Sequence, residues 1–167
     1  MEKNNLMSNN NEIAVLDFGS QYTHLIARRV RELGVKSHIY PNDTAVDKLK
    51  NAVGIILSGG PKSVIQAGSL SYDKNIFDLN IPVLGLCHGH QLIAKHFGGI
   101  VESGSAREYG KADIKITQNN PIFADLSEKT QVWMSHGDHV AKIPENFVEI
   151  ANSTGQSNTA MANEDKK

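Results

Sequence analysis

Residues 82–94 read PVLGLCHGHQLIA and contain the only cysteine of the chain. A short apolar run leads into Gly-x-Cys-x-Gly, and apolar residues at helical spacing follow it directly. This order predicts that Cys87 lies on a sharp strand-to-helix turn, the arrangement that holds a nucleophile at the end of a strand. Gly85 and Gly89 supply the small flanking residues that such a turn needs. The stretch therefore indicates both an α/β fold and a reactive thiol.

The turn predicts two chemical properties of Cys87. The positive end of the following helix is expected to lower the thiol pKa below its ordinary value of about 8.5. The backbone N–H of His88 is expected to point at an oxyanion formed on a carbonyl that the sulfur attacks. Two other interpretations are a small buried cysteine and a metal site made of Cys87, His88 and His90. No second Cys/His pair lies at zinc-site spacing, and both histidines are predicted to be packing or loop residues.

The rest of the first hundred residues alternates between two kinds of pattern. Strands are predicted at 13–17, 35–40, 53–57 and 82–86, and helices at 21–33, 44–51, 72–79 and from the cysteine to about residue 97. Strands that are nearly all apolar indicate a mostly parallel sheet with helices on both faces. Beyond residue 101, short strands are predicted at 113–117, 131–134, 147–151 and 159–162. They predict a smaller antiparallel layer in the C-terminal part.

Composition narrows the class of protein. The chain has 167 residues and a formal net charge of -1, which argues against a general nucleic-acid or membrane-surface binder. A single cysteine forms no internal disulfide, so nothing indicates an oxidising compartment. Residues 1–11 are predicted to be a disordered polar leader without a signal-peptide pattern, and 12–167 to be one domain. A cytoplasmic protein without membrane spans is expected.

A second glycine turn follows the strand predicted at 53–57. Ser58-Gly59-Gly60-Pro61 ends that strand, and the carboxyl ends of neighbouring parallel strands lie together, so the turn is expected beside Cys87. The backbone N–H of Gly60 would then be the second oxyanion donor. An ordinary glycine turn is the alternative. A phosphate-binding loop is not supported, because no Gly-Lys-Ser/Thr follows.

Taken together, these residues resemble the class I glutamine amidotransferases, and most closely the amidotransferase part of GMP synthetases. The elbow and the Ser-Gly-Gly-Pro turn are shared across the class. The narrower resemblance comes from the first and the last of five matching stretches. The five stretches are VLDFGSQYTHLIARRVRELGV (15–35), GIILSGGPKSV (54–64), PVLGLCHGHQLIA (82–94), REYGKADIKIT (107–117) and VWMSHGDHV (132–140).

The resemblance implies a role for each matching position. Cys87 would attack the side-chain amide of glutamine and form a thioester, with the N–H groups of Gly60 and His88 holding the oxyanion. Glutamine would be held by four further residues, Gln91, Ser135, Gly137 and Asp138. For the other residues of the last stretch, Trp133 and Met134 are expected in the core, and His136, Asp138 and His139 in a solvated polar loop or near the ammonia-consuming partner.

The resemblance also implies a partner. Ammonia would pass to an ATP-pyrophosphatase, XMP-binding synthetase domain or subunit, which would form GMP. ATP and Mg are expected only there, and no cofactor or metal is expected in this chain. The synthetase loop Ser-Gly-Gly-x-Asp-Ser is not found in this sequence.

One departure from the family pattern concerns the catalytic base. In the family, the base and its carboxylate partner come from a Phe-His-Pro-Glu stretch, which this sequence lacks. The domain is therefore predicted to be truncated at its C-terminal end and to be inactive or weak in glutamine hydrolysis. Two other functions stay open: another hydrolase with a cysteine elbow, acting on peptides or aldehydes, and a non-catalytic module that binds glutamine or a partner.

Overall fold

The structure is a computed structural model that describes residues 11–66, 71–153, 158–163 and 165. The leader predicted at 1–11 lies outside this part of the chain, apart from Asn11.

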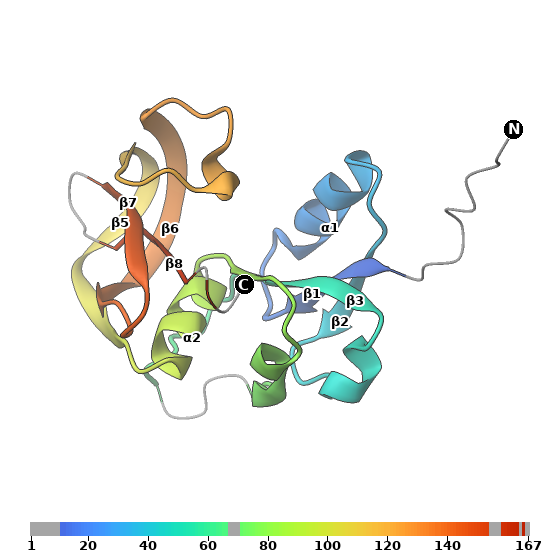
Figure 1. Cartoon of the computed structure of the whole chain (residues 1–167). Coiled ribbons are helices and arrows are strands. Elements are labelled where there is room, and N and C mark those ends of the chain that lie inside the picture. The colour runs from blue at the N-terminus through green and yellow to red at the C-terminus, as the bar shows by residue number, and fades with distance from the viewer. Residues whose placement is uncertain (1–10, 67–70, 154–157, 164, 166–167) are drawn as a thin grey trace, which may run out of the picture.

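Four parallel strands form the first sheet of the described chain, and most of them are labelled in Figure 1. They are β1 (Glu12–Asp17), β2 (Ser37–Pro41), β3 (Ala52–Leu57) and β4 (Val83–Gly85), and their spatial order is β2-β1-β3-β4. All pairings are parallel and in regular register apart from a shift at the start of β1. The predicted parallel sheet is confirmed, and β4, which precedes Cys87, lies at an edge of the sheet as described.

Two α-helices pack on this sheet. α1 (Thr23–Glu32) contacts β1 and β2, and α2 (His88–His96) contacts β3 and β4. The helices predicted at 44–51 and 72–79 are only short 3-10 helices, η1 (Val46–Leu49) and η2 (Lys74–Asp78). Each of them fully buries one apolar side chain, Leu49 or Ile76, so one turn is enough to cover the sheet there.

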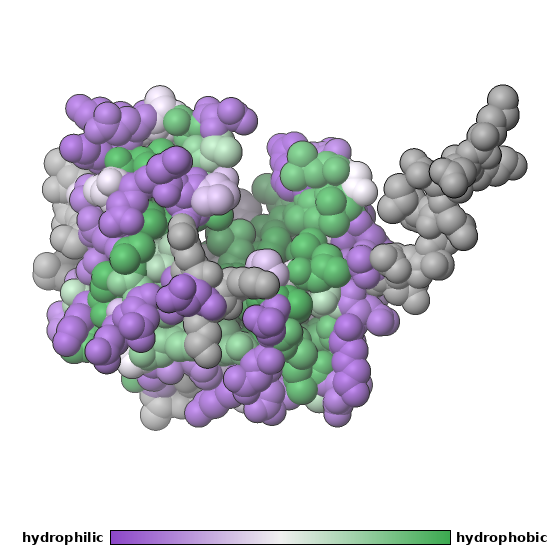
Figure 2. Space-filling view, in the orientation of Figure 1, coloured by the Kyte–Doolittle hydropathy of each residue, from purple (hydrophilic) through white to green (hydrophobic). Residues whose placement is uncertain are grey.

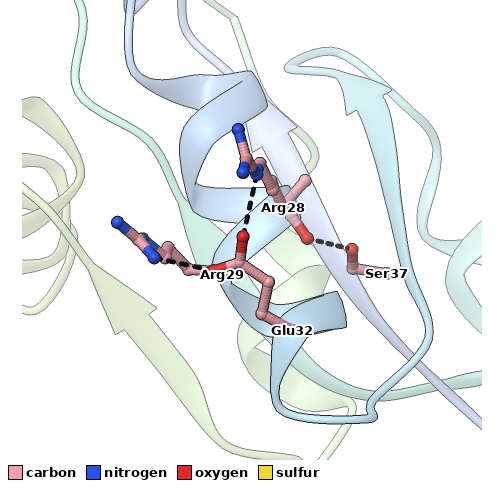
Figure 3. A network of polar contacts seen from close by, with 5 residues as sticks. Arg28, Arg29, Glu32 and Ser37 are labelled. Carbon is pink, nitrogen blue, oxygen red and sulfur yellow. Dashed lines mark hydrogen bonds and ion pairs between the residues drawn. The ribbon is translucent and has the colours of Figure 1, made fainter.

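The outer face of α1 is polar and carries a small network (Figure 3). Arg28 and Arg29 bind the two carboxylate oxygens of Glu32 at 2.8 and 2.7 Å and lower the pKa of that carboxyl. These pairs are exposed, so they add little to stability. On the inner side, Ser37 Oγ donates to the Ala27 carbonyl oxygen at 2.7 Å. This bond ties α1 to the start of β2.

The second sheet is antiparallel and has the order β6-β5-β7-β8. Its strands are β5 (Ile100–Ile116), β6 (Lys129–Lys142), β7 (Val148–Ser153) and β8 (Ala160–Ala162), with the 3-10 helix η3 (Pro121–Phe123) between β5 and β6. The predicted antiparallel layer is confirmed, but β5 and β6 extend far beyond the predicted strands. The added segments are mostly polar, and Glu102, Ser103 and Glu108 pair there with residues of β6, so apolar alternation gives no signal for them.

One main core joins the two sheets. Its centre is formed by side chains of β1, β3 and α2, which are Ala14, Leu16, Ile55, Leu57, Leu92 and Ala94. Val101 of β5 and Val140 of β6 belong to the same cluster. The second sheet is therefore packed against the α2 side of the first sheet, and this contact positions β6 beside Cys87.

Candidate active site

Cys87 lies on a strained turn between β4 and α2. Its backbone has φ 52° and ψ −107°, a conformation that non-glycine residues rarely adopt. Both flanking glycines are required by close backbone contacts. A Cβ on Gly85 would lie 2.5 Å from the carbonyl carbon of Gly89, and a Cβ on Gly89 would lie 2.4 Å from the carbonyl oxygen of Leu57. The predicted elbow is therefore confirmed, and its sequence pattern has a steric cause.

The Ser-Gly-Gly-Pro turn lies beside the elbow, as predicted. A Cβ on Gly59 would lie 3.6 Å from Cys87 Cβ, which is ordinary van der Waals contact. Ser58 is fully buried, accepts a hydrogen bond from the Phe18 N–H at 2.9 Å and donates to the Gly59 carbonyl oxygen at 2.9 Å. A Cβ on Gly60 would lie 2.6 Å from the Phe18 carbonyl oxygen. Sequence reasoning missed the part that Phe18 plays in holding this turn.

Strand β6 supplies the other side of the site. The Cys87 thiol donates to the Ser135 carbonyl oxygen at 3.7 Å. Gln91, one turn along α2 and only 6% exposed, donates from Nε2 to the Asp138 carbonyl oxygen at 2.8 Å. The Asp138 carboxylate accepts from Ser103 Oγ at 3.1 Å. The predicted nucleophile and three of the four residues predicted to hold glutamine are therefore joined by hydrogen bonds.

Two expectations about the stretch around Ser135 are wrong. Residues 135–139 form part of strand β6 rather than a loop. Trp133 is 67% exposed and not in the core, whereas Met134 is buried as predicted. His139 is half-buried in the strand, and the side chain of His136 lies outside the described part of the structure.

The acidity of the thiol also differs from the prediction. Cys87 opens to solvent, yet the surrounding protein desolvates its sulfur and raises the pKa of the thiol above its ordinary value. The N–H of His88 opposes this effect, and the negative charge of Asp138 adds to it. Because burial outweighs the hydrogen bond from the His88 N–H, the resting form of Cys87 at neutral pH is the thiol.

The ring of His88 packs inside the protein, in line with the predicted packing or loop position. It is 1% exposed, its Nδ1 lies 2.8 Å from the Lys62 carbonyl oxygen, and its centroid lies 5.2 Å from the Phe18 ring. Burial lowers the pKa of this imidazole, so it is neutral. Within the described residues, no group of three or more His, Cys, Asp or Glu side chains could hold a metal ion.

A cleft of about 1940 Å³ opens in front of Cys87. One part is lined by the site residues Cys87, Gln91, Ser135, Gly137 and Asp138, and the remainder is mostly apolar. Figure 2 shows apolar side chains around the hollow between α1 and the antiparallel sheet. The volume exceeds the 300–1,000 Å³ or so of ordinary small-molecule pockets, so a small ligand would occupy only part of it.

The family comparison agrees with this geometry. A family model described as glutamine amidotransferase class-I matches residues 14–167. The chain belongs to the class-I glutamine amidotransferases. No helix of this amidotransferase among the described residues is long and apolar enough to cross a membrane.

Curated relatives place the amidotransferase near one group of enzymes. It is 52% identical over 159 residues to the glutamine-hydrolysing GMP synthase of Bacillus velezensis, covering 94% of this chain. It is 51% identical over 160 residues to that of Bacillus subtilis, covering 95% of this chain. In both cases it spans 31% of the relative's length, so it corresponds to the amidotransferase part alone.

Solved structures show the same fold. A protein from Thermoplasma acidophilum described as a GMP synthase subunit superimposes with a TM-score of 0.82 at 35% identity, covering 92% of this chain and 78% of that one. A glutamine amidotransferase from Thermotoga maritima gives a TM-score of 0.74 at 20% identity, over 93% of this chain and 72% of that one, which supports the fold alone.

Proposed function

We propose that this amidotransferase hydrolyses glutamine and supplies the ammonia to a GMP-forming synthetase. The observation that carries the proposal is the position of Cys87 on a strained elbow next to Gly59, where an added Cβ would lie 3.6 Å from Cys87 Cβ, with its thiol hydrogen-bonded to the Ser135 carbonyl oxygen. A thiol held between two potential oxyanion donors fits acyl transfer. Sequence identities of 52% and 51% to glutamine-hydrolysing GMP synthases support glutamine as the substrate.

The reaction begins at the amide carbonyl carbon of glutamine. Cys87 gives up its proton, the C–S bond forms, and the oxygen becomes an oxyanion that accepts hydrogen bonds from the N–H groups of Gly60 and His88. The C–N bond then breaks, and the nitrogen takes up a proton and leaves as ammonia. Water attacks the thioester, which releases glutamate and restores the thiol.

Strand β6 and α2 are suited to hold the substrate. The Asp138 carboxylate offers a negative charge to the α-ammonium group of glutamine, and the backbone of Ser135 and Gly137 lines the same cleft. Gln91 already donates its amide N–H to the Asp138 carbonyl oxygen. Its side-chain oxygen would therefore accept a hydrogen bond from the substrate, while its bond to Asp138 holds β6 against α2.

The base that takes the Cys87 proton would come from beside β4. As described, β4 pairs only with β3, and the neighbouring side chains Leu84 and Leu86 are 40% and 36% exposed. A histidine with a carboxylate partner at this edge would lie next to Cys87 and could act as the base. Without such a base, acylation by an activated substrate is expected to be faster than deacylation.

The ammonia would be used by a synthetase domain or subunit in the cytoplasm. That partner would activate XMP with ATP and Mg and form GMP. This chain spans 31% of the length of the curated relatives, and such a partner would account for the remaining length.

The test is Cys87→Ala in the amidotransferase assembled with its synthetase part. GMP formation from glutamine should be lost, while GMP formation from added ammonium should continue at the original rate. A variant that loses both activities equally would show that Cys87 supports the structure and is not the nucleophile. Release of ammonia from glutamine, but not from peptides, separates this function from that of a peptidase.

A further inference from the structure

We propose that His88 is a positioning residue. Its ring holds the Ser58–Lys62 turn in the place from which the N–H of Gly60 can donate to the oxyanion. The inference rests on the proposed function, and it assigns to the side chain of His88 a role separate from that of its backbone N–H.

The turn is fastened at both ends. At its start, the buried Ser58 hydroxyl binds the N–H of Phe18 at 2.9 Å. At its end, the Lys62 carbonyl oxygen lies 2.8 Å from Nδ1 of His88. Gly60 lies midway and packs against the Phe18 backbone so closely that a Cβ would fall 2.6 Å from its carbonyl oxygen. The ring of His88 therefore closes a turn whose middle residue is the proposed donor.

The chemistry of the contact fixes the tautomer. A carbonyl oxygen only accepts, so Nδ1 of His88 carries the proton and donates to Lys62. The ring is 1% exposed and packs against Phe18, which leaves it one orientation. Nε2 is buried and makes no hydrogen bond within the described residues. The side chain is thus a rigid link between the elbow and the turn.

Loss of this link would free one end of the turn. Lys62 is an exposed residue, so its carbonyl can rotate toward water once His88 no longer holds it. Rotation of that peptide would shift the backbone on both sides, including the nearby Gly60. A displacement of about 1 Å in a reacting group can cost 10²-fold in rate.

The experiment compares two reactions of Cys87 in the 167-residue chain. The first is the burst of nitrophenolate from the γ-(4-nitrophenyl) ester of glutamate, which passes through an oxyanion and needs no acid for its leaving group. The second is alkylation by iodoacetamide, which forms no oxyanion. His88→Phe keeps the ring and removes the donor, whereas His88→Asn restores an N–H near the position of Nδ1.

We expect His88→Phe to slow the ester burst by about 10- to 100-fold while its alkylation stays within about twofold of wild type. His88→Asn should recover most of the burst. A burst unchanged in His88→Phe would overturn this inference alone. Equal slowing of both reactions, or no recovery in His88→Asn, would also overturn it, because the ring would then be a general packing group. A wild-type burst that persists in Cys87→Ala would refute the proposed function itself.

Discussion

A methyl group added at Gly60 tests the oxyanion turn directly. A Cβ at this position would lie 2.6 Å from the Phe18 carbonyl oxygen, whereas ordinary contacts begin near 3.4 Å. The turn in Gly60→Ala must therefore move by about 0.8 Å, because the obstacle is backbone held by the buried Ser58 hydroxyl. A shift of this size takes the N–H out of hydrogen-bond range of the oxyanion. Loss of one such donor costs about 10²- to 10³-fold in rate, or roughly 3–4 kcal/mol.

The assay is the nitrophenolate burst from the activated glutamate ester, with iodoacetamide alkylation of Cys87 as the measure of an intact thiol. Gly54→Ala is the matched control. It adds the same methyl group to β3, where the nearest atom is the flexible Cδ1 of Ile13 at 3.0 Å. Overpacking of this kind costs about 1–3 kcal/mol of stability, so both variants are compared below their unfolding temperatures.

The control should keep its burst within a few-fold of wild type, and Gly60→Ala should lose at least two orders of magnitude. If Gly60→Ala folds, alkylates normally and acylates at the wild-type rate, then the turn donates nothing to the oxyanion. That result would leave only the elbow N–H as a donor and would contradict the proposed mechanism.

Three further changes test other parts of the structure. Asp138 raises the pKa of the Cys87 thiol, so Asp138→Asn should bring the midpoint of the pH dependence of iodoacetamide alkylation to lower pH; an unchanged or higher midpoint would contradict this. Leu84 is exposed on β4, at the edge of the sheet as described, and an open strand edge favours pairing with another chain. We therefore expect the chain to self-associate in sedimentation and Leu84→Lys to lower its average mass; an unaltered mass distribution would overturn this expectation. Ser58→Ala leaves the buried Phe18 N–H unpaired and should lower the free energy of unfolding in urea by about 1–3 kcal/mol; an unchanged free energy of unfolding would contradict this.

The parallel half of the fold could be predicted because its signals are local. The apolar strands and the amphipathic pattern of 21–33 placed β1 to β4 and α1 to within a few residues. The elbow could be predicted from the sequence for the same reason, since only glycine fits at positions 85 and 89. The long hairpin of β5 and β6 was not, because backbone pairing of polar segments leaves no apolar alternation to detect.

The errors at the site come from tertiary contacts. The helix terminus was expected to lower the pKa of Cys87, but burial and the charge of Asp138, brought in by the second sheet, raise it. Trp133 and Met134 were both expected in the core. Adjacent residues on a strand point to opposite faces, so the two-residue period could have shown that only one of them is buried.

The bonds between α2 and β6 make the site depend on the order in which the chain folds. Cys87 and Ser135 are 48 residues apart, and Gln91 and Asp138 are 47 apart. On a ribosome, the parallel sheet and the elbow can form while β6 is still inside the exit tunnel. Nascent chains that have exposed Cys87 but not Ser135 would thus carry a reachable thiol with an unfinished pocket. Because β6 brings the charge of Asp138, which raises the pKa of the thiol, alkylation of Cys87 would become slower when the second sheet docks, and the time of that change would report the docking.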